Sequence, residues 1–402
     1  MSIKHPAEVT TAAPASAKLK KDHEDKAFAL MSRGFGRKGI NRHKKTEDMM
    51  SRNAIGSSIS ETPEREDFYE RISQKNLAPL WTSLSTLITS EPRSQCVPAH
   101  WSFADVRTAM VEAGGIITAK EAERRVLVLE NPGLRGQSKI TTDLYAGVQL
   151  VLPGEVAPAH RHAQTALRFV LEGGGAHTSV NGERTTMNEG DFIITPPMAW
   201  HDHGNESDKP IFWLDGLDIP VVQFLDTSFA EHLNEDEQSI TRHTGDSDAR
   251  YGANLLPVDH KPSGGSSPVF NYPYARTREA LERMRREDAW DGCHGLKMRY
   301  ANPNNGGYAM ATMGTFVQLL PKGFSTNAYR STDATVFVPI EGRGRTRIGS
   351  DVVVEWGPRD IFVVPSWHRV KHEADDDSIL FSFSDRPIQE ALHLFREERG
   401  NL

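Results

Sequence analysis

Apolar residues recur in short runs between Gly and Pro residues in the middle of the chain. Leu144–Leu152 and Leu167–Leu171 alternate or run apolar, and residues 154–205 carry Val, Leu and Ile beside Gly and Pro. Runs of this length that end at turn residues are typical of β-strands. The pattern predicts short strands of an antiparallel barrel and a mainly β fold.

Helical patterns precede this β-rich region. Within residues 67–88, apolar residues recur at three- and four-residue steps, as on an amphipathic helix interrupted near Pro79. Phe103–Ala113 and Ala119–Arg125 have the pattern of two more helices, the second with Thr118 as its N-cap. The remaining expected elements are a strand at Val126–Leu129 and a charged helix at Thr277–Trp290.

The second half of the chain repeats the first. Adding 169 to a residue number takes Gln149 to Gln318, Gly154 to Gly323, Asp191 to Asp360 and Pro196 to Pro365. A constant offset across such landmarks indicates a duplication. The chain is therefore expected to contain two barrels of similar size.

The first 65 residues are polar, poor in aromatic residues and richer in Lys and Arg than in Asp and Glu. This composition is typical of a disordered extension, and its interspersed acidic residues argue against a mitochondrial presequence. The expected organisation is a disordered extension (1–65), a helical lead-in (66–130), an N-terminal barrel with a metal site (131–225), a linker with a helix (226–295) and a C-terminal barrel without metal ligands (296–402).

The strongest chemical signal is a trio of histidines, His160, His162 and His201. Residues two apart on a strand face the same side, so His160 and His162 point the same way with Cα atoms about 6.6 Å apart. Two imidazoles at that separation can share one metal ion, and His201 from a later strand supplies a third nitrogen. The trio therefore predicts a metal site with open positions.

The spacing matches the two motifs of the cupin family. Gly154, five residues and His160-x-His162 follow the first motif, while Gly190, Pro196, His201 and Asn205 fall on the second. The Glu ligand of the first motif is absent, because Ala166 and Leu167 occupy its alternative positions. Three neutral ligands leave a divalent metal its full +2 charge, which favours a dianionic chelating substrate. Fe(II) suits nitrogen donors with open positions, although Zn, Cu, Ni and Mn remain alternatives at this point.

At the positions given by the offset of 169, the second barrel lacks these ligands. It takes His160 to Tyr329 and His162 to Ser331, and Trp367-His368 resembles Trp200-His201 after a shortening of two residues. A single His does not hold a metal, so the C-terminal barrel is expected to be structural or to serve an interface.

Composition narrows the class of protein. The net charge is −7 and charged residues make up 25% of the 402 residues, which is unfavourable for general nucleic-acid binding. Only Cys96 and Cys293 are present, so a disulfide framework is not expected and a reducing, cytoplasmic setting is favoured. No apolar run of about 18 residues and no signal-peptide core occur, so neither a membrane span nor secretion is expected.

Two polar residues interrupt the predicted barrel strands, Gln149 and Arg168. Arg168 lies six residues after His162, so both side chains face the same side of a strand. An Arg there pairs with a neighbouring strand or binds a carboxylate through its planar fork, and a vacant metal beside it favours the carboxylate. Taken alone, Arg124-Arg125 is interpreted as a solvated basic pair and not as an anion-binding element.

Longer strings of residues resemble the gentisate 1,2-dioxygenase family. They are Asn131–Gly136, Leu144–Gly147, His160–His162, Ala166–Phe169, Gly182–Met187, Trp200–Asn205 and Trp213–Asp218, and the resemblance runs from about Phe68 to the C-terminus. The family consists of bicupin homotetramers with Fe(II) in the N-terminal barrel, and it includes enzymes that cleave salicylate and 1-hydroxy-2-naphthoate.

The resemblance implies roles for residues of this chain. His160, His162 and His201 would hold Fe(II), which gentisate chelates through its carboxylate and 2-hydroxyl before O2 opens the ring to maleylpyruvate. Around the metal, Arg168 would bind the carboxylate, and Gln149 and Arg124 would hydrogen-bond nearby. His203 would donate to oxygen or act as acid or base, and Asp215 would orient a ligand imidazole or cap a turn. Tyr145 would contact the 5-hydroxyl and favour gentisate over salicylate.

Two other functions fit part of the pattern. A metal-dependent sugar isomerase of the cupin class usually has a carboxylate ligand, which Ala166 and Leu167 do not supply. A non-enzymatic binding or storage bicupin lacks a complete ligand set, as the C-terminal half does, but the N-terminal half keeps all three histidines. Within the dioxygenases, salicylate or 1-hydroxy-2-naphthoate is the alternative substrate.

Overall fold

The computed structural model of the 402-residue chain describes residues 62–262, 264–286 and 290–400. The described chain forms two units, one ending at Ser90 and one beginning at Glu91. The predicted disordered extension lies almost wholly outside the described residues.

The first unit contains two short helices separated at Pro79, as the sequence predicted: α2 (Pro63–Ser73) and α3 (Leu80–Leu87). The Thr62 hydroxyl accepts a hydrogen bond from the Arg65 amide at the start of α2, and a Pro opens its first turn. Leu80, Trp81 and Leu87 of α3 are exposed.

The second unit begins with helices that lead into the first barrel. The elements are β1 (Ala99–Trp101), α4 (Phe103–Ile116), α5 (Ala119–Ala122), β2 (Val126–Val128) and the 3-10 turn η1 (Pro132–Leu134). Thr118 and Glu121 form a capping box at the start of α5. The helix expected over 119–125 is shorter than predicted, because Glu123 turns to a positive φ of 53° and the next residues enter β2.

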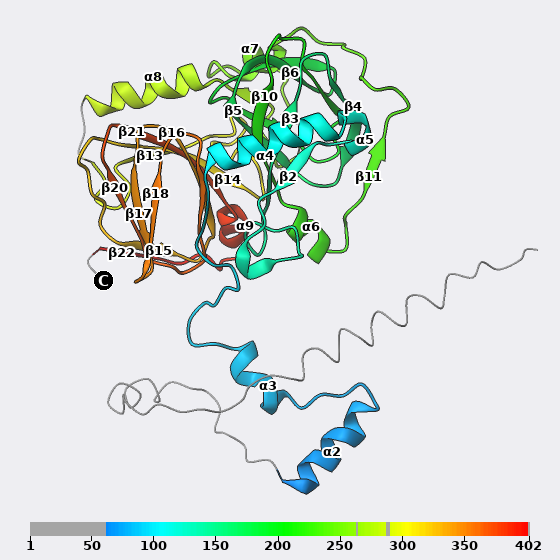
Figure 1. Cartoon of the computed structure of the whole chain (residues 1–402), viewed down its shortest axis with the longest axis vertical. Helices are drawn as coiled ribbons and strands as arrows, with labels where there is room; N and C mark the ends of the chain where they lie inside the picture. The colour runs from blue at the N-terminus through cyan, green and yellow to red at the C-terminus, as the bar shows by residue number, and fades with distance from the viewer. Residues whose placement is uncertain (1–61, 263, 287–289, 401–402) are drawn as a thin grey trace, which may run out of the picture. The chain divides into compact units, whose positions relative to one another are not determined.

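The N-terminal barrel consists of two antiparallel sheets (Figure 1). Their strands are β3 (Tyr145–Val151), β4 (Val156–His162), β5 (Ala166–Glu172), β6 (Gly174–Val180), β7 (Glu183–Asn188), β8 (Phe192–Thr195), β9 (His201–Gly204), β10 (Ile211–Leu217), β11 (Ala230–His232) and β12 (Asn271–Tyr272). The strand orders are β12-β8-β5-β10-β3-β2 and β11-β4-β9-β6-β7. Two-residue alternation then sends every second side chain into the barrel.

The C-terminal barrel has the same arrangement, with strand orders β1-β19-β16-β21-β14-β13 and β18-β17-β20-β15-β22. Its strands are β13 (Leu296–Arg299), β14 (Gly314–Leu320), β15 (Tyr329–Ser331), β16 (Thr335–Glu341), β17 (Gly344–Ile348), β18 (Val352–Trp356), β19 (Ile361–Val364), β20 (Val370–Ala374), β21 (Ser378–Ser384) and β22 (Glu397–Arg399). The helices between and after the barrels are α6 (Ile219–Phe224), α7 (Asp246–Tyr251), α8 (Tyr274–Arg285) and α9 (Arg386–Ala391).

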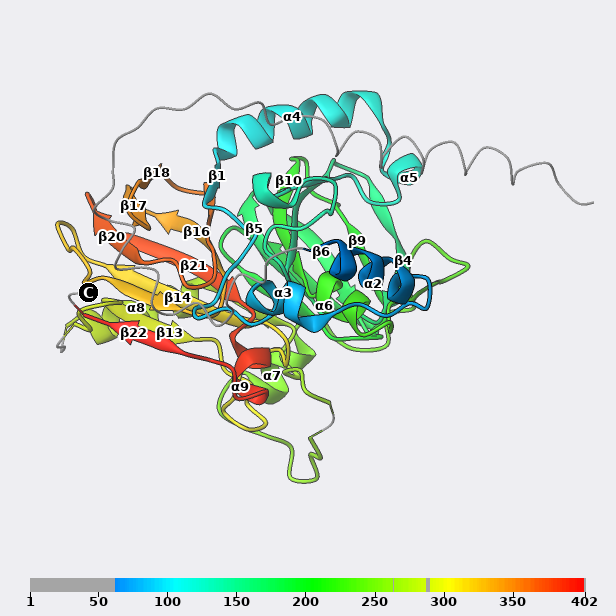
Figure 2. The same ribbon diagram turned by 90° about the horizontal axis from the view of Figure 1, so that it is seen from below.

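The two barrels pack against each other through their six-stranded sheets, which lie side by side in Figures 1 and 2. One continuous core contains residues of both sheets, and the rings of Phe169 and Phe381 stack at 4.2 Å across it. These strands are buried on both faces, one toward the partner barrel and one toward their own interior, which explains their nearly continuous apolar runs. The predicted mainly β, bicupin fold is confirmed.

The structure corrects the alignment of the two repeats. Met198 and Trp367 both have positive φ, and their amides donate to the carbonyls of His162 and Ser331 respectively, so the offset of 169 still holds there. His368 therefore corresponds to Ala199 and not to His201. The shortening by two residues falls later, in the turn after β9 and β20, because Asp218 and Asp385, 167 apart, make equivalent bonds to the amides of residues 165 and 334.

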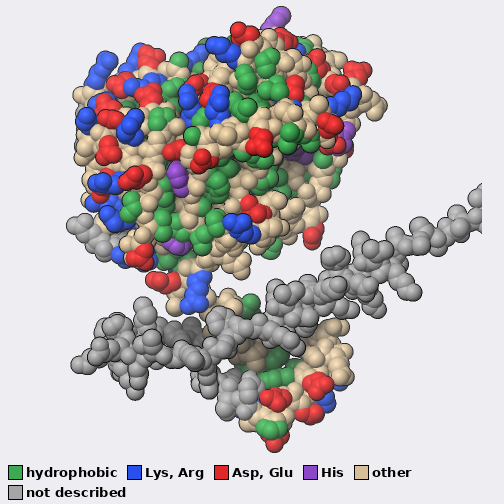
Figure 3. Space-filling model, in the orientation of Figure 1, with side chains coloured by type: hydrophobic (Ala, Val, Ile, Leu, Met, Phe, Trp, Pro, Cys, Tyr) green, Lys and Arg blue, Asp and Glu red, His purple; other side chains and the backbone are tan. Residues whose placement is uncertain are grey.

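On the face shown in Figure 3, acidic and basic side chains are interspersed. No helix of the described residues is long and apolar enough to cross a bilayer.

Candidate active site

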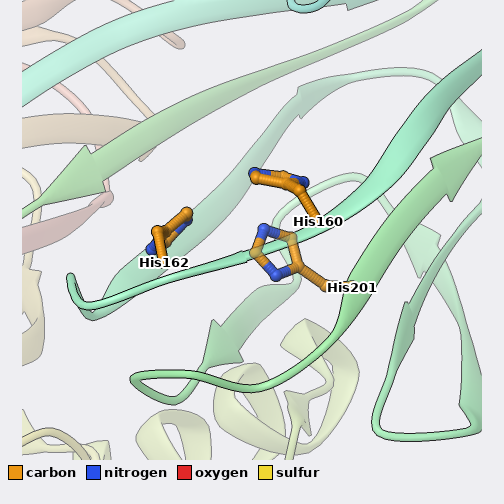
Figure 4. Close-up of side chains that lie close together, drawn as sticks. All are labelled: His160, His162 and His201. Carbon is orange, nitrogen blue, oxygen red and sulfur yellow. The ribbon is translucent and has the colours of Figure 1, made fainter. Parts of the chain in front are cut away.

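Three imidazoles converge inside the N-terminal barrel, as Figure 4 shows. His160 and His162 lie on β4, and His201 opens β9 directly opposite His160 in the ladder. One ring nitrogen from each lies within 4.8 Å of those of the other two. The trio is therefore brought together as the strand spacing predicted.

Main-chain carbonyls hold two of these rings in place. Nδ1 of His162 lies 2.9 Å from the carbonyl of Gln164, and Nδ1 of His201 lies 2.9 Å from that of Ala199. Each carbonyl accepts a hydrogen bond from Nδ1–H, which fixes the tautomer and leaves Nε2 with a lone pair. Nε2 of His201 is buried and has no hydrogen-bond partner among the residues that the structure describes. A buried imidazole nitrogen without a partner fits a metal site, because a metal ion would supply the missing interaction.

Burial keeps all three rings neutral, which is the form that binds a metal. Burial, reinforced by Arg124, lowers the pKa of His160 to about 2, and burial lowers the pKa of His162 to about 4. Burial and the neighbouring His160 lower the pKa of His201 well below its usual value. Three neutral nitrogen donors with open positions fit a divalent transition metal.

Arg168 lies beside the triad on β5 and is almost fully buried. It faces Asp215 of β10 across the ladder, with 3.5 Å between Nε of Arg168 and Oδ1 of Asp215, and it donates to the hydroxyl of Thr195 at 2.6 Å. Burial lowers the pKa of Arg168, while burial raises the pKa of Asp215 to about 6. Arg168 therefore pairs with Asp215 on the neighbouring strand, which is one of the two alternatives that the sequence left open.

Asp215 does not orient a ligand imidazole. Its carboxylate faces Arg168 and accepts a hydrogen bond from the indole of Trp213 at 3.0 Å. The expectation that it holds an imidazole or caps a turn was therefore wrong, because the carbonyls after β4 and before β9 orient the rings instead.

The Arg124-Arg125 pair is not solvated, contrary to the sequence interpretation. The guanidinium of Arg124 contacts the ring of His160 and donates to the carbonyl of Pro158 at 2.7 Å. Burial, together with the charge of Arg168, lowers the pKa of Arg124 to about 10. Arg125 is buried in a two-bond pair with Glu155. Adjacent residues at the start of a strand point to opposite sides, so Arg124 points into the barrel while Arg125 pairs with Glu155 at its edge.

Gln149 and Tyr145 both lie on β3, and Gln149 is buried with no side-chain hydrogen bond among the described residues. Burial, with the charge of Asp215, raises the pKa of Tyr145, so its hydroxyl stays protonated. Gly147 lies between them, and a Cβ at this position would come within 2.5 Å of Val126 and 3.0 Å of the Tyr145 hydroxyl. The glycine therefore makes room for the Val126 side chain and for the Tyr145 hydroxyl.

His203 is buried two residues after His201 on β9. Its Nδ1 lies 2.9 Å from the hydroxyl of Thr178, and its Nε2 is buried without a partner. Burial, with the charge of Arg168, lowers its pKa well below the usual value, so the ring is neutral.

Sequence reasoning missed the groups that position these side chains. Thr178 supports His203 and Thr195 supports Arg168, but an isolated Thr on a strand carries no signal of such a role. The carbonyls of Gln164 and Ala199 have no side-chain signature at all. Only their position two residues from a motif histidine hints at them.

Known proteins share both the sequence and the fold. Residues 147–217 match the cupin domain model. Gentisate 1,2 dioxygenase 1 of Aquipseudomonas alcaligenes is 62% identical over 84% of this chain and 97% of its own length. The chain belongs to the gentisate 1,2-dioxygenase family. It is thus an enzyme of the ring-cleaving dioxygenases, and the resemblance drawn from its motifs is confirmed.

More distant members of the family differ in substrate. A 5-aminosalicylate 1,2-dioxygenase from a Comamonas species is 36% identical over 82% of this chain and 89% of its own length. The crystal structure of salicylate 1,2-dioxygenase from Pseudoaminobacter salicylatoxidans with gentisate superposes with a TM-score of 0.80 at 33% identity, covering 85% of this chain and 95% of that chain.

Proposed function

We propose that this protein is an Fe(II)-dependent gentisate 1,2-dioxygenase that converts gentisate and O2 to maleylpyruvate, with both oxygen atoms entering the product. The observation that carries the proposal is the convergence of His160, His162 and His201 without a carboxylate ligand, in a chain 62% identical to a gentisate dioxygenase. The alternative substrates are salicylate and 1-hydroxy-2-naphthoate, and the relative named for 5-aminosalicylate adds a third.

The residues present fit a ferrous ion. Three neutral imidazoles leave the +2 charge uncompensated, and a substrate that chelates through a carboxylate and a deprotonated hydroxyl brings the same charge of opposite sign. When bound, Fe(II) supplies the path by which electrons of the aromatic ring reach O2. The protein keeps the imidazole donors neutral through burial and keeps their rings oriented through carbonyl contacts.

Arg168 is proposed to bind the carboxylate of the substrate. Its guanidinium is buried within the barrel, and the facing Asp215 and Thr195 use part of its hydrogen-bonding capacity and fix its plane. Arg124, whose pKa is lowered partly by Arg168, adds a second positive charge near His160. Two neighbouring arginines favour a dianionic acid, and Gln149 offers an amide that has no protein partner.

His203 and Tyr145 are proposed to act on the hydroxyl groups and on oxygen. His203 is neutral, Thr178 holds its Nδ1, and its free Nε2 can accept or donate a proton within the cavity. Tyr145 stays protonated and offers its hydroxyl to the 5-hydroxyl of gentisate. This contact is the basis for placing gentisate above salicylate, which lacks the 5-hydroxyl.

An oxygen-electrode assay on the Fe(II)-loaded protein tests the proposal with gentisate, 5-aminosalicylate, salicylate and 1-hydroxy-2-naphthoate. We expect one O2 consumed per gentisate and the highest kcat/KM for gentisate. Turnover of salicylate above that of gentisate would transfer the assignment to the alternative substrate. Absence of oxygen uptake with all four acids, in protein shown by metal analysis to contain iron, would reject a dioxygenase.

The proposal includes a cytoplasmic homotetramer, which follows the family expectation. Both cysteines are buried and unpaired, in keeping with a reducing compartment. Light scattering after size-exclusion chromatography measures the assembly state directly, and four times the chain mass of 44.7 kDa is expected.

A further inference from the structure

The interior of the C-terminal barrel has lost the metal ligands but has not become apolar. At the positions of His160, His162 and His201 it carries Tyr329, Ser331 and Val370, since the offset of 169 holds through β20. A small cavity remains there, and the centre of a water molecule can move within about 20 Å³ of it. A volume of that size holds a water molecule or a small ion but no aromatic acid.

Two polar side chains face this cavity without protein partners. Gln318 is 1% exposed, and neither its Nε2 nor its Oε1 has a hydrogen-bond partner in the part of the chain that the structure describes. Lys297 lies directly across the ladder from Gln318 and makes no hydrogen bond or ion pair among the described residues. Its ammonium lies 4.9 Å from the centre of the Phe316 ring. A buried primary amide with both ends unpaired costs free energy unless an occupant satisfies it.

The charge of the cavity is positive. Arg386 and Asp333 neutralise each other, with 3.2 Å between Nε and Oδ2, and Arg386 also donates to the hydroxyl of Tyr329. Burial lowers the pKa of His294 and of His372 to about 3 in each case, so neither ring carries a charge at neutral pH. Burial, with the charge of Arg386, lowers the pKa of Lys297 to about 8, so its ammonium is mostly charged at neutral pH, and it has no ion-pair partner among the described residues. In the N-terminal barrel, Val126 occupies the place opposite Gln149, so this charge belongs to the second barrel alone.

We propose that the C-terminal barrel binds a small monovalent anion, of the size of chloride or formate, between the ammonium of Lys297 and the side-chain N–H groups of Gln318. The ammonium supplies the charge and the amide supplies a directed donor, while the surrounding rings exclude bulk water. A single ammonium matches one negative charge, so a monovalent anion is favoured over a dianion such as sulfate. The site is independent of the reaction at the histidine trio.

Thermal unfolding of the full-length, Fe(II)-loaded protein in bromide, chloride, formate or sulfate at equal ionic strength tests this site. The difference in Tm between the wild type and Lys297→Met should grow with the logarithm of bromide or chloride concentration, because a ligand of the native state alone stabilises it. It should grow less with sulfate, whose general stabilisation of folded proteins is the same in both and cancels. Lys297→Met should weaken bromide binding at least about tenfold and Gln318→Leu about fivefold. Lys322→Met is the matched control, since Lys322 is exposed on the same barrel.

Removal of a buried charge alone can raise the Tm, so the readout is the anion-dependent part of the Tm and not its absolute value. Anomalous scattering from a bromide-soaked crystal gives a second measurement, with a peak expected between Lys297 and Gln318 in the wild type and none in Lys297→Met. A formate response without a bromide response would assign the site to a one-carbon carboxylate. Water density alone at that position, or the same anion response in wild type and Lys297→Met, would overturn the proposal.

Discussion

The two barrels share strand order, turns and even single hydrogen bonds, yet only one of them holds the histidine trio. Thr178 bonds His203 in the first barrel as Thr346 bonds His372 in the second, at 2.9 and 2.8 Å. The fold is maintained in both by strand pairing and by the shared core between the six-stranded sheets. Because that core lies outside the barrel interiors, the interior residues diverged without loss of the fold.

The differences inside the barrels are concentrated on charge. Arg168 and Asp215 face each other in the first barrel, and Phe337 and Ser382 face each other at the same place in the second. Gln149 and Gln318 occupy the same place in the two barrels, and neither side-chain amide has a protein hydrogen bond among the described residues. The second barrel folds without the arginine pair and the trio, which supports the proposal that these residues serve the substrate.

Importing a residue of the second barrel into the metal site should have the largest effect. His201→Val reproduces Val370 and removes one of three ligands, so we expect loss of bound iron and a fall in kcat/KM of at least about a thousandfold, about 4 kcal/mol. Metal analysis and oxygen uptake measure both. His368→Ala is the control, because His368 corresponds to Ala199, and it should keep full iron content and activity. Iron loss in that control would show that the second barrel contributes to metal binding.

Arg168→Phe reproduces Phe337 and should leave the iron in place. Loss of a buried charged partner costs about 2–5 kcal/mol, so kcat/KM for gentisate should fall at least about 30-fold. The unpaired Asp215 should also destabilise the protein. The double variant Arg168→Phe with Asp215→Ser imports both residues of the second barrel, and it should recover thermal stability without recovering activity. Recovery of activity would show that Arg168 is only structural.

Thr178→Val should release Nδ1 of His203. A single hydrogen bond is worth about 1 kcal/mol, so kcat should fall about fivefold while iron content stays unchanged. Thr346→Val removes the equivalent bond to His372 in the second barrel, and it also removes the acceptor of the Trp356 indole. That variant should lower the Tm and leave kcat as it is. Equal effects of the two substitutions on kcat would argue against a role for His203 at the reacting oxygen.

The smallest effect concerns a contact between the barrels. Asp218 accepts a hydrogen bond from Thr312 at 2.6 Å, and the repeat places Asp143 at the corresponding position opposite Asp385. Burial, with the charge of Asp143, raises the pKa of Asp385 well above its usual 3.8. A raised carboxyl pKa gives stability that is complete below pH 3.8 and is lost as the pH rises through the folded-state value.

Asp143→Thr imports the hydroxyl of the other contact and should stabilise the protein by about 1 kcal/mol at pH 8. The difference from wild type should shrink as the pH falls through the raised folded-state pKa of Asp385, where its carboxyl takes up a proton. Chemical denaturation across this range measures the free energy of unfolding of both proteins. When both carry the same metal, the contribution of histidine titration is equal in the two and cancels in the difference. A difference that does not change with pH would contradict the carboxyl pair.

Much of the site was predictable because it is local. The His160-x-His162 spacing on one strand decides a shared direction. Arg168 lies on β5, which belongs to the other sheet and follows a turn, so even spacing from His162 does not account for its position beside the trio. The fate of Arg124 and Arg125 was not predictable, because burial of an arginine depends on which strands and loops surround it. Asp215 was misassigned for the same reason: its partner lies 47 residues away across a ladder, where sequence gives no register.

The sequence by itself determined the repeat, the strand-rich pattern and the three histidines proposed as metal ligands, since each follows from periodicity or motif spacing. The tertiary structure decided which barrel each short strand joins: β1 pairs with β19 of the C-terminal barrel although it precedes the first barrel in the chain. The tertiary structure also decided that His368 corresponds to Ala199, and it decided which buried polar groups have no partner among the described residues. These outcomes depend on contacts between segments far apart in the chain, where the free energy of pairing and burial is shared by many residues and no local pattern records it.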